Sequence, residues 1–336
     1  MQSNPSPHNR GFPEAQSAES PSGTGSIPKT VRLTIAICTR NRAGFLEKAI
    51  RSVLPQLASS DELLIVDNAS TDGTPAVAAR LAKEDSRIRV YREETLGLSA
   101  GRNAAHRLGR AAYVLFLDDD AVVRPGWVDA YMGAIERHAG RKVGAIAGGC
   151  IPVYEAPPPA WLKPTADQLD LGDKEFTIPL GVRTPGGGNC AYNTAAVQDV
   201  GGFCVDLKRA EDTDMYLRLQ RENYEIWWLP AAPIYHFISR QRLEFRRMAK
   251  AAFNEGRASA RMRLGLIDSP VRREFYRAWR VAITVPGALG LFIVALATIP
   301  FQRGRIAVRT CHRGVRMLGQ GCQMLADLAR GKFRYA

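Results

Sequence analysis

The chain has 336 residues, of which 46% are hydrophobic and 24% are charged, with a formal net charge of +13. This composition is that of a globular protein with room for one large or two ordinary domains, and it excludes a fibrous or largely disordered chain. The positive charge predicts an anionic partner, and because much of it lies beyond residue 236, around an apolar run, it favours a membrane surface over nucleic acid.

The N-terminal stretch and the cysteines carry little functional information. Residues 1–30 are rich in Ser, Pro, Gly and Asn and lack the apolar centre of a signal peptide, so we expect them to be disordered. The cysteines show no CxxC spacing and stand at positions 38, 150, 190, 204, 311 and 322. They predict reduced, mostly buried thiols in a cytosolic setting.

Strands and helices alternate along residues 31–117. Helical spacing of apolar residues predicts a first helix that ends near Pro55. A second helix is expected to begin at Thr74 and Pro75, and a third at Gly97. Branched and aromatic apolar runs predict strands at 31–38, 63–66, 88–91 and 111–117. This alternation predicts an α/β fold with a mostly parallel sheet and right-handed crossovers.

The strand at 111–117 ends on consecutive carboxylates, Asp118, Asp119 and Asp120. Like charges at the end of a buried strand repel one another and resist desolvation, so a cation is expected beside them. Mg²⁺ and Mn²⁺ prefer carboxylate and phosphate oxygens, and open α/β sheets bind ligands at the carboxyl ends of their strands. The sequence therefore predicts a divalent metal site here, and a solvated acidic turn is the alternative.

Other polar residues belong on the same edge of the predicted sheet. Asp67 ends the strand at 63–66, and Gly97 with Gly101 begins the helix that leads to the acidic strand. Backbone N–H groups at that helix start, together with Arg102, would suit a phosphate. An ordinary helix start is the alternative for the glycine pair.

Stretches of this chain resemble the family 2 glycosyltransferases, which have the nucleotide-sugar-binding GT-A fold. The matching pieces occur in the family's order at 35–56, 63–74, 96–105, 113–128, 186–203 and 210–226. The resemblance implies a GT-A domain over residues 31–240. It also implies an inverting transfer of a sugar from a nucleotide diphosphate donor, a UDP-sugar being expected, to a hydroxyl, with Mg²⁺ or Mn²⁺ at a DxD motif.

The resemblance also assigns residues to the donor and the metal. Thr39 and Arg42 lie in the first turn that contacts the donor, and Asp67 looks like the acid that contacts the nucleotide base. Asp118 and Asp120 match the DxD pair and are both expected at the metal, Asp120 as the usual ligand and Asp118 serving also the ribose or a metal-bound water. His236 resembles a third metal ligand, with a hydrogen-bonded structural histidine as the alternative.

An inverting transfer needs a base that takes the proton of the acceptor hydroxyl. Glu211 and Asp212 resemble the family's ED motif, and we expect Asp212 to be the base. Acids in a first helical turn also complement the helix dipole, which is the structural alternative, and Asp214 is expected to be structural. The glycine run 185–188 makes Asn189 a candidate contact to the donor sugar.

Two further features concern the acceptor. The QxxRW motif of processive synthases is absent after the ED motif, so the chain is expected to transfer a single sugar. Residues 150–180 are rich in proline and suit an irregular insertion beside the acceptor site, where Trp161 either stacks on a sugar or packs internally.

The region 241–336 is predicted to be basic and helical. Residues 281–301 carry no charge, Pro286 and Pro300 shorten the continuous piece, and arginines flank the run at 272, 273, 277, 280, 303, 305, 309, 313 and 316. This pattern favours a re-entrant or interface-lying element on anionic lipid, with a buried helix or a single span as alternatives. Residues 306–329 predict an amphipathic helix.

These features together predict a glycosyltransferase at the cytoplasmic face of a membrane, peripheral, monotopic or single-pass. The expected acceptor is a lipid-linked sugar or a growing surface glycan, and nucleic acid is not expected as a partner. One alternative is a non-catalytic nucleotide-sugar or glycan-binding module of the same fold. Another is a DxD-type phosphohydrolase, whose first Asp attacks phosphorus. The sequence leaves the sugar, the acceptor and the metal open.

Overall fold

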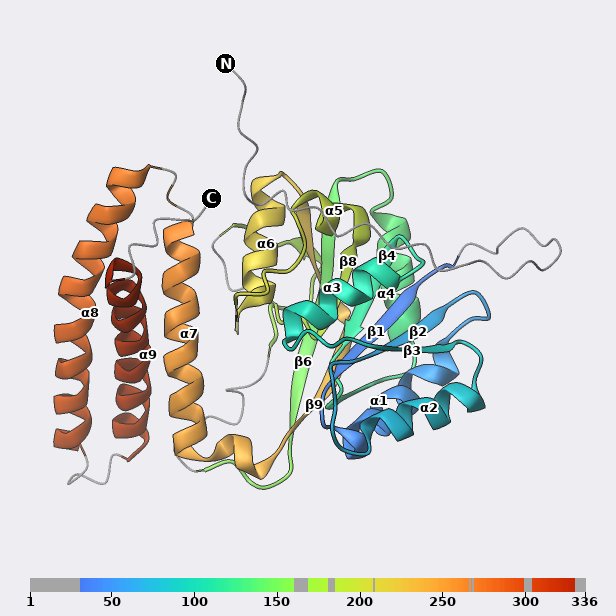
Figure 1. The fold of residues 1–336 in the computed structure, drawn as a ribbon, viewed down its shortest axis with the longest axis horizontal. Coiled ribbons are helices and arrows are strands. Elements are labelled where there is room, and N and C mark those ends of the chain that lie inside the picture. Colours follow the sequence, from blue (N-terminus) through green and yellow to red (C-terminus); the bar gives the residue numbers. More distant parts are fainter. Residues whose placement is uncertain are drawn as a thin grey trace, which may run out of the picture.

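The computed structural model describes residues 31–159, 169–180, 185–207, 209–265, 267, 269–298 and 304–329. The segment 1–30 and Trp161 lie outside the described residues. An α/β domain comes first, and three long helices then stand side by side next to it (Figure 1).

The first half of the α/β domain is parallel, as the sequence predicts. Strands β2 and β4 flank β1, and β3 lies outside β2, all in parallel register. The elements are β1 (Thr34–Thr39), α1 (Ala43–Val53), η1 (Leu54–Gln56), β2 (Glu62–Asp67), α2 (Thr74–Glu84), β3 (Ile88–Arg92), α3 (Leu98–Leu108) and β4 (Tyr113–Leu117). The predicted α/β class is confirmed.

The second half continues the same sheet with mixed strand directions. Strand β8 is antiparallel to β4 and β6, β6 is parallel to β9, and β5 and β7 pair antiparallel with β9. Register shifts between β6 and β9 curl this half of the sheet. The elements are β5 (Ala121–Val123), α4 (Trp127–Arg137), β6 (Val143–Tyr154), β7 (Phe176–Thr177), β8 (Asn189–Asn193), α5 (Thr194–Asp199), α6 (Glu211–Arg221) and β9 (Glu225–Ile238).

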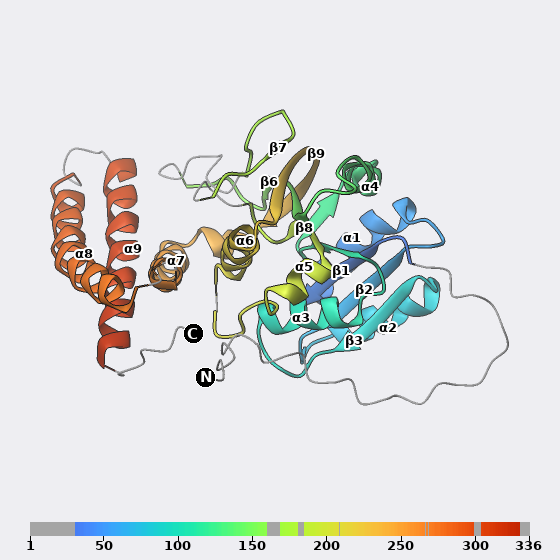
Figure 2. The same cartoon turned by 90° about the horizontal axis from the view of Figure 1, so that it is seen from above.

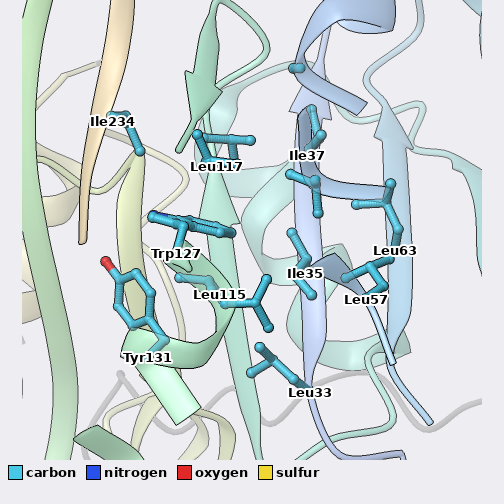
Figure 3. Packing of buried hydrophobic residues seen from close by; sticks show 14 of the residues in the cluster. Leu33, Ile35, Ile37, Leu57, Leu63, Leu115, Leu117, Trp127, Tyr131 and Ile234 are labelled. Carbon is cyan, nitrogen blue, oxygen red and sulfur yellow. The ribbon is translucent and has the colours of Figure 1, made fainter. Parts of the chain in front are cut away.

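Helices cover both faces of the sheet, which is why its central strands are apolar along their whole length. Ile35, Ile37 and Leu115 point into one cluster, which α1, α2 and α4 cover and which Figure 3 shows. Ala36, between Ile35 and Ile37, and Phe116, next to Leu115, point to the opposite face, into a second cluster under α3, α5 and α6. The polar ends of these strands are therefore left at the edges of the sheet.

The C-terminal unit consists of η2 (Arg240–Leu243), α7 (Phe245–Gly265), α8 (Pro270–Thr298) and α9 (Gly304–Ala329). Helix α9 packs on both of its neighbours. Helices α7 and α9 approach closely at two glycines, because a Cβ on Gly256 would lie 2.0 Å from the carbonyl oxygen of Arg316, and one on Gly319 2.1 Å from that of Phe253. The helix predicted at 306–329 is confirmed.

Three expectations need correction. Pro286 does not end a helical piece, because α8 runs through it, held by α9 on the opposite side. An internal proline removes one hydrogen bond and bends a helix that packing otherwise maintains. Residues 150–180 are not wholly irregular, since their first five residues continue β6 and Phe176–Thr177 form β7. The free cysteines are not mostly buried, because only Cys190 is buried and Cys322 is exposed.

In the part of the chain that the structure describes, no helix combines the length and the apolar character needed to cross a membrane.

Candidate functional site

The carboxyl ends of β1, β2 and β4 place Thr39, Asp67 and Asp118 along one edge of the sheet. Asp67 is buried, and its carboxylate accepts a hydrogen bond from the Ser70 N–H and pairs with Arg92 at 3.1 Å. The sequence-predicted convergence of these strand ends is therefore present.

A candidate metal centre lies at the end of β4. Strand β5 pairs with β9 so that Ala121 lies opposite His236, which brings the histidine beside the acidic run. One ligand atom each from Asp118, Asp120 and His236 lies within 4.8 Å of the others. The shortest of these separations joins His236 Nε2 to Asp120 Oδ1, at 2.9 Å. The fold brings together all three residues that the sequence predicted as metal ligands.

The electrostatics of this centre are those of buried carboxylates sharing few cations. Burial raises the pKa of Asp118, and Arg102 and His236 oppose that rise. Burial would also raise the pKa of Asp120, but the hydrogen bond and charge of His236, with nearby arginines, lower it overall. Burial would lower the pKa of His236, yet Asp120 raises it to about 10. The imidazole is therefore protonated at neutral pH in this geometry and balances part of the negative charge, and it would have to lose this proton to ligate a metal ion.

Asp119, the middle acid of the run, has partners of its own. It accepts a hydrogen bond of 2.7 Å from the Thr39 hydroxyl, and Arg42 Nε lies 4.0 Å away. Burial, with further contributions from the charges of Asp120 and Asp118, raises the pKa of Asp119 to about 6, against the effect of the Thr39 bond. This bond ties the end of β1 to the acidic run.

Sequence reasoning missed one residue of the site, Arg242. It lies on η2, directly after the strand that carries His236, and its Nη1 is 3.3 Å from Asp120 Oδ2 and 3.4 Å from His236 Nε2. Arg42 Nη2 lies 3.7 Å from the same Asp120 oxygen. The guanidinium groups of Arg42, near the start of the α/β domain in sequence, and of Arg242, just after its last strand, thus meet at the carboxylate of Asp120. The available signal was a basic turn immediately following the predicted histidine.

A glycine loop connects Asp212 to the acidic run. The Gly187 N–H donates to Asp212 Oδ2 at 2.9 Å, and the Asp118 N–H donates to the Gly188 carbonyl at 3.1 Å. A Cβ on Gly188 would lie 2.0 Å from Asp118 Oδ2, so no larger residue fits there. The backbone of this loop approaches the protein's own carboxylates.

Asp212 lies in the first turn of α6, which begins after Ala210 in the left-handed region at φ 60°. Its Oδ1 accepts the Thr213 N–H at 2.7 Å, so each carboxylate oxygen is held by one backbone donor. Oδ1 also accepts from the Thr213 hydroxyl at 3.4 Å, whereas the second lone pair of Oδ2 has capacity for a further hydroxyl. Asp214 pairs instead with Arg218 at 2.7 Å, as a structural acid would.

Arg102 and Glu211 form a buried ion pair under the glycine loop. Arg102 Nη1 donates to Glu211 Oε1 at 2.8 Å, and a Cβ on Gly187 would lie 2.6 Å from that same nitrogen. Burial raises the pKa of Glu211, and the charge of Arg102 opposes the rise. The pair packs against the loop and supports it, and the expected phosphate contact of Arg102 and the role of Glu211 in the ED motif stay predictions.

Asn189 is also part of the support. Its side-chain oxygen accepts hydrogen bonds from Trp127 Nε1 and the Tyr131 hydroxyl, and its nitrogen donates to the carbonyls of Gly149 and Ala232. The buried amide has used its whole hydrogen-bonding capacity within the protein. Its surroundings favour a structural role over the expected contact to the donor sugar.

The donor set at Asp118, Asp120 and His236 fits a divalent cation. Two carboxylates and an imidazole converge there, and the buried Asp120 already pairs with the cationic side chains of Arg42, His236 and Arg242. Mg²⁺ and Mn²⁺ accept such oxygen-rich sites and complete them with water and phosphate oxygens.

The curled sheet with this acidic strand end defines a GT-A fold. The chain is similar to the mannosyltransferase PcManGT of Pyrobaculum calidifontis, whose structure contains GDP-Man and Mn²⁺, with a TM-score of 0.56, 17% identity and coverage of 89% of each chain. It is also similar to residues 1–349 of S. aureus TarS in complex with UDP-GlcNAc, with a TM-score of 0.51, 15% identity and coverage of 91% of this chain and 94% of that one.

Sequence comparison then gives the family. Residues 34–201 match the family described as glycosyl transferase family 2, and the chain belongs to that family. A 122-residue stretch is 30% identical to the GalNAc(5)-diNAcBac-PP-undecaprenol beta-1,3-glucosyltransferase of Campylobacter jejuni, covering 36% of this chain and 38% of that protein. The chain thus spans well under half the length of this curated relative. Family membership sets the phosphohydrolase alternative aside.

Proposed function

We propose that this protein transfers a single sugar, with inversion, from a nucleotide diphosphate sugar to a hydroxyl of a lipid-linked or surface-glycan acceptor. A UDP-sugar is the expected donor, and a divalent cation is required. The observation that carries the proposal is the link from the Asp118, Asp120 and His236 centre to Asp212 through Gly187 and Gly188. These two hydrogen bonds connect the proposed donor-binding centre to the proposed base.

Donor binding falls to the first half of the domain and to η2. Asp67 would accept a hydrogen bond from the nucleotide base, and Thr39 holds Asp119 in place at the end of β1. Arg42 and Arg242 would bind the diphosphate, for which planar guanidinium groups are suited. A divalent cation bound at Asp118, Asp120 and His236 would neutralise charge on the diphosphate as it leaves.

Asp212 would serve as the base. The acceptor oxygen bonds to the anomeric carbon while the bond from that carbon to the phosphate oxygen breaks, and the hydroxyl proton passes to a carboxylate oxygen of Asp212. The nucleoside diphosphate leaves with the bond's electron pair, facing the two guanidinium groups. Attack from the side opposite the leaving group inverts the anomeric centre.

The acceptor class and the location are part of the same proposal. We place the protein at the cytoplasmic face of a membrane, where lipid-linked sugars are built. The net charge of +13 supports attraction to an anionic surface. The relative from Campylobacter jejuni is named for an undecaprenol-linked acceptor, which is consistent with such a substrate.

Calorimetric titration of the full chain tests the proposal. UDP, GDP, dTDP and their sugars are titrated with and without Mn²⁺, and we expect one nucleotide to bind only with the metal. Asp120→Ala should abolish that binding, and Asp129→Ala, which removes an exposed acid on α4, should retain it. Folded protein that binds none of these ligands would contradict the proposal. So would metal-dependent donor binding without any sugar transfer, which would favour a binding module.

A further inference from the structure

The outer face of α8 carries exposed apolar side chains over most of its length. Phe275 is 74% exposed, Trp279 50%, Ile283 41%, Leu289 62% and Ile293 60%. Exposed Ala278, Ala282, Pro286 and Gly290 fill the positions between them. All lie at helical spacing, so they form one continuous surface, which we call the α8 face.

Two arginines of α8 are directed away from this face. Arg277 is 2% exposed and pairs with Glu274 at 2.7 Å, and Arg280 donates to Gln320 of α9 at 2.6 Å. Two of the arginines expected to hold lipid are therefore directed into the protein. Helix α8 packs on α9, and α9 and α7 lie between α8 and the α/β domain (Figure 2).

The charge of the three-helix unit indicates what binds to the α8 face. Residues 245–329 contain 15 lysines and arginines against 4 aspartates and glutamates, a net charge of +11. Arg272, Arg313 and Arg316 are exposed. Two copies meeting through this unit would repel each other, whereas an anionic bilayer would attract it. An exposed apolar helix face on a strongly basic unit is typical of a helix that lies in a lipid interface.

We infer that the α8 face inserts into the interface of an anionic membrane, with α8 parallel to the bilayer plane. The stretch from Phe275 to Ile293 would extend about 27 Å along the surface, at about 1.5 Å per residue. It starts before the uncharged run at 281–301 and adds Phe275 and Trp279, an aromatic residue suited to the interface. The inference deepens the proposed membrane location and is independent of the transfer chemistry.

The orientation has a consequence for the site. The carboxyl end of α8 and the start of α7 lie at the same end of the molecule (Figure 1), and η2, which carries Arg242, directly precedes α7. Insertion of the α8 face would therefore set the distance between η2 and the bilayer through the three packed helices.

Vesicle flotation of the full chain tests the inference, using phosphatidylcholine vesicles with and without phosphatidylglycerol. We expect binding only with the anionic lipid, and a Phe275→Ser, Leu289→Ser double variant should bind at least about tenfold more weakly, since it removes two inserted side chains. Val205→Ser is the matched control, because Val205 is 61% exposed on the α/β domain. It should bind as the unmodified chain does.

Trp279 fluorescence gives a second measurement. Anionic vesicles should shift the emission to the blue, and Trp279→Phe should lose the shift while retaining vesicle binding. The inference is overturned if the double variant binds vesicles as the unmodified chain does. It is also overturned if the unmodified chain ignores vesicles and light scattering shows a dimer that the double variant breaks. Calorimetric donor binding of the same variants reports on the proposed chemistry separately.

Discussion

The α/β domain and the three-helix unit distribute the same residue types in opposite ways. In the α/β domain, Leu115 and Ile37 are fully buried between sheet and helices, and the charged residues of the site meet at the edge. In the three-helix unit, Leu289 and Ile293 face outward, whereas Arg277 is buried. Burial of apolar residues stabilises the first region, while exposure of apolar residues prepares the second for a partner.

The two regions also differ in how their charged residues are balanced. The site pairs its carboxylates with arginines and a histidine over distances of 2.9 to 3.7 Å. The three-helix unit has an excess of basic residues that its few acids cannot balance. The first arrangement holds the carboxylate of Asp120 in place, and the second supplies attraction over a longer range.

The largest effect should come from the base. Asp212→Asn keeps the size of the side chain and removes its ability to take a proton, so we expect kcat to fall about 10²- to 10⁴-fold with donor binding retained. Asp214→Asn, two positions further along the same helical turn, breaks only the Arg218 pair and should change kcat little. Initial rates and calorimetry measure both. Full activity in Asp212→Asn would assign the base elsewhere.

Leucine truncation compares the two regions directly. Leu115 is 0% exposed and Leu289 is 62% exposed. Leu115→Ala should lower the free energy of unfolding by about 2–5 kcal/mol, because it leaves a cavity in the core. Leu289→Ala should change it by no more than about 0.5 kcal/mol in the absence of lipid. Denaturant unfolding followed by circular dichroism gives both values, and equal losses would contradict the contrast.

His106 should make the α/β domain sensitive to acid. The ring is buried among Phe116, Tyr192 and Phe203, and within the described residues neither ring nitrogen has a hydrogen-bond partner. Burial, with a smaller effect of Arg102, lowers the pKa of His106 from 6.5 to about 3.

The unfolded chain therefore binds a proton at His106 below pH 6.5 that the folded chain refuses until about pH 3. The free energy of unfolding should fall as pH decreases through this window, by about 1.4 kcal/mol per pH unit from this group. His106→Phe, which keeps an aromatic ring among the others, should lack that component. The difference in unfolding free energy between the two proteins, measured from pH 7 downward, should depend on pH, and a constant difference would contradict the prediction.

The fold could be predicted from sequence where local pattern and topology agree. Apolar runs located β1 to β4, and the parallel order placed Asp67 and Asp118 on one edge. The predicted pairing of Asp120 with His236 rested on family resemblance, because only the β5–β9 register brings them together. The supporting roles of Asn189 and Arg102 could not be predicted, since their partners lie far away in sequence. Likewise, the rotation of α8 about its own axis, which buries Arg277 and exposes Phe275, depends on packing against α9.

Arg242 should affect activity far less than Asp212 does, because it acts on donor binding and its side chain is 47% exposed. A hydrogen bond to a charged group contributes about 1.5–3 kcal/mol, and exposure favours the lower end of that range. Arg242→Gln should therefore raise the donor KM about tenfold with kcat nearly unchanged. Arg240→Gln is the matched control, since Arg240 lies on the same 3-10 helix and no side-chain contact to the acidic run is described for it. If Arg242→Gln instead reduced kcat and left KM unchanged, the arginine would act on the transition state. The segment η2, which joins the two regions, would then contribute to catalysis and not only to donor binding.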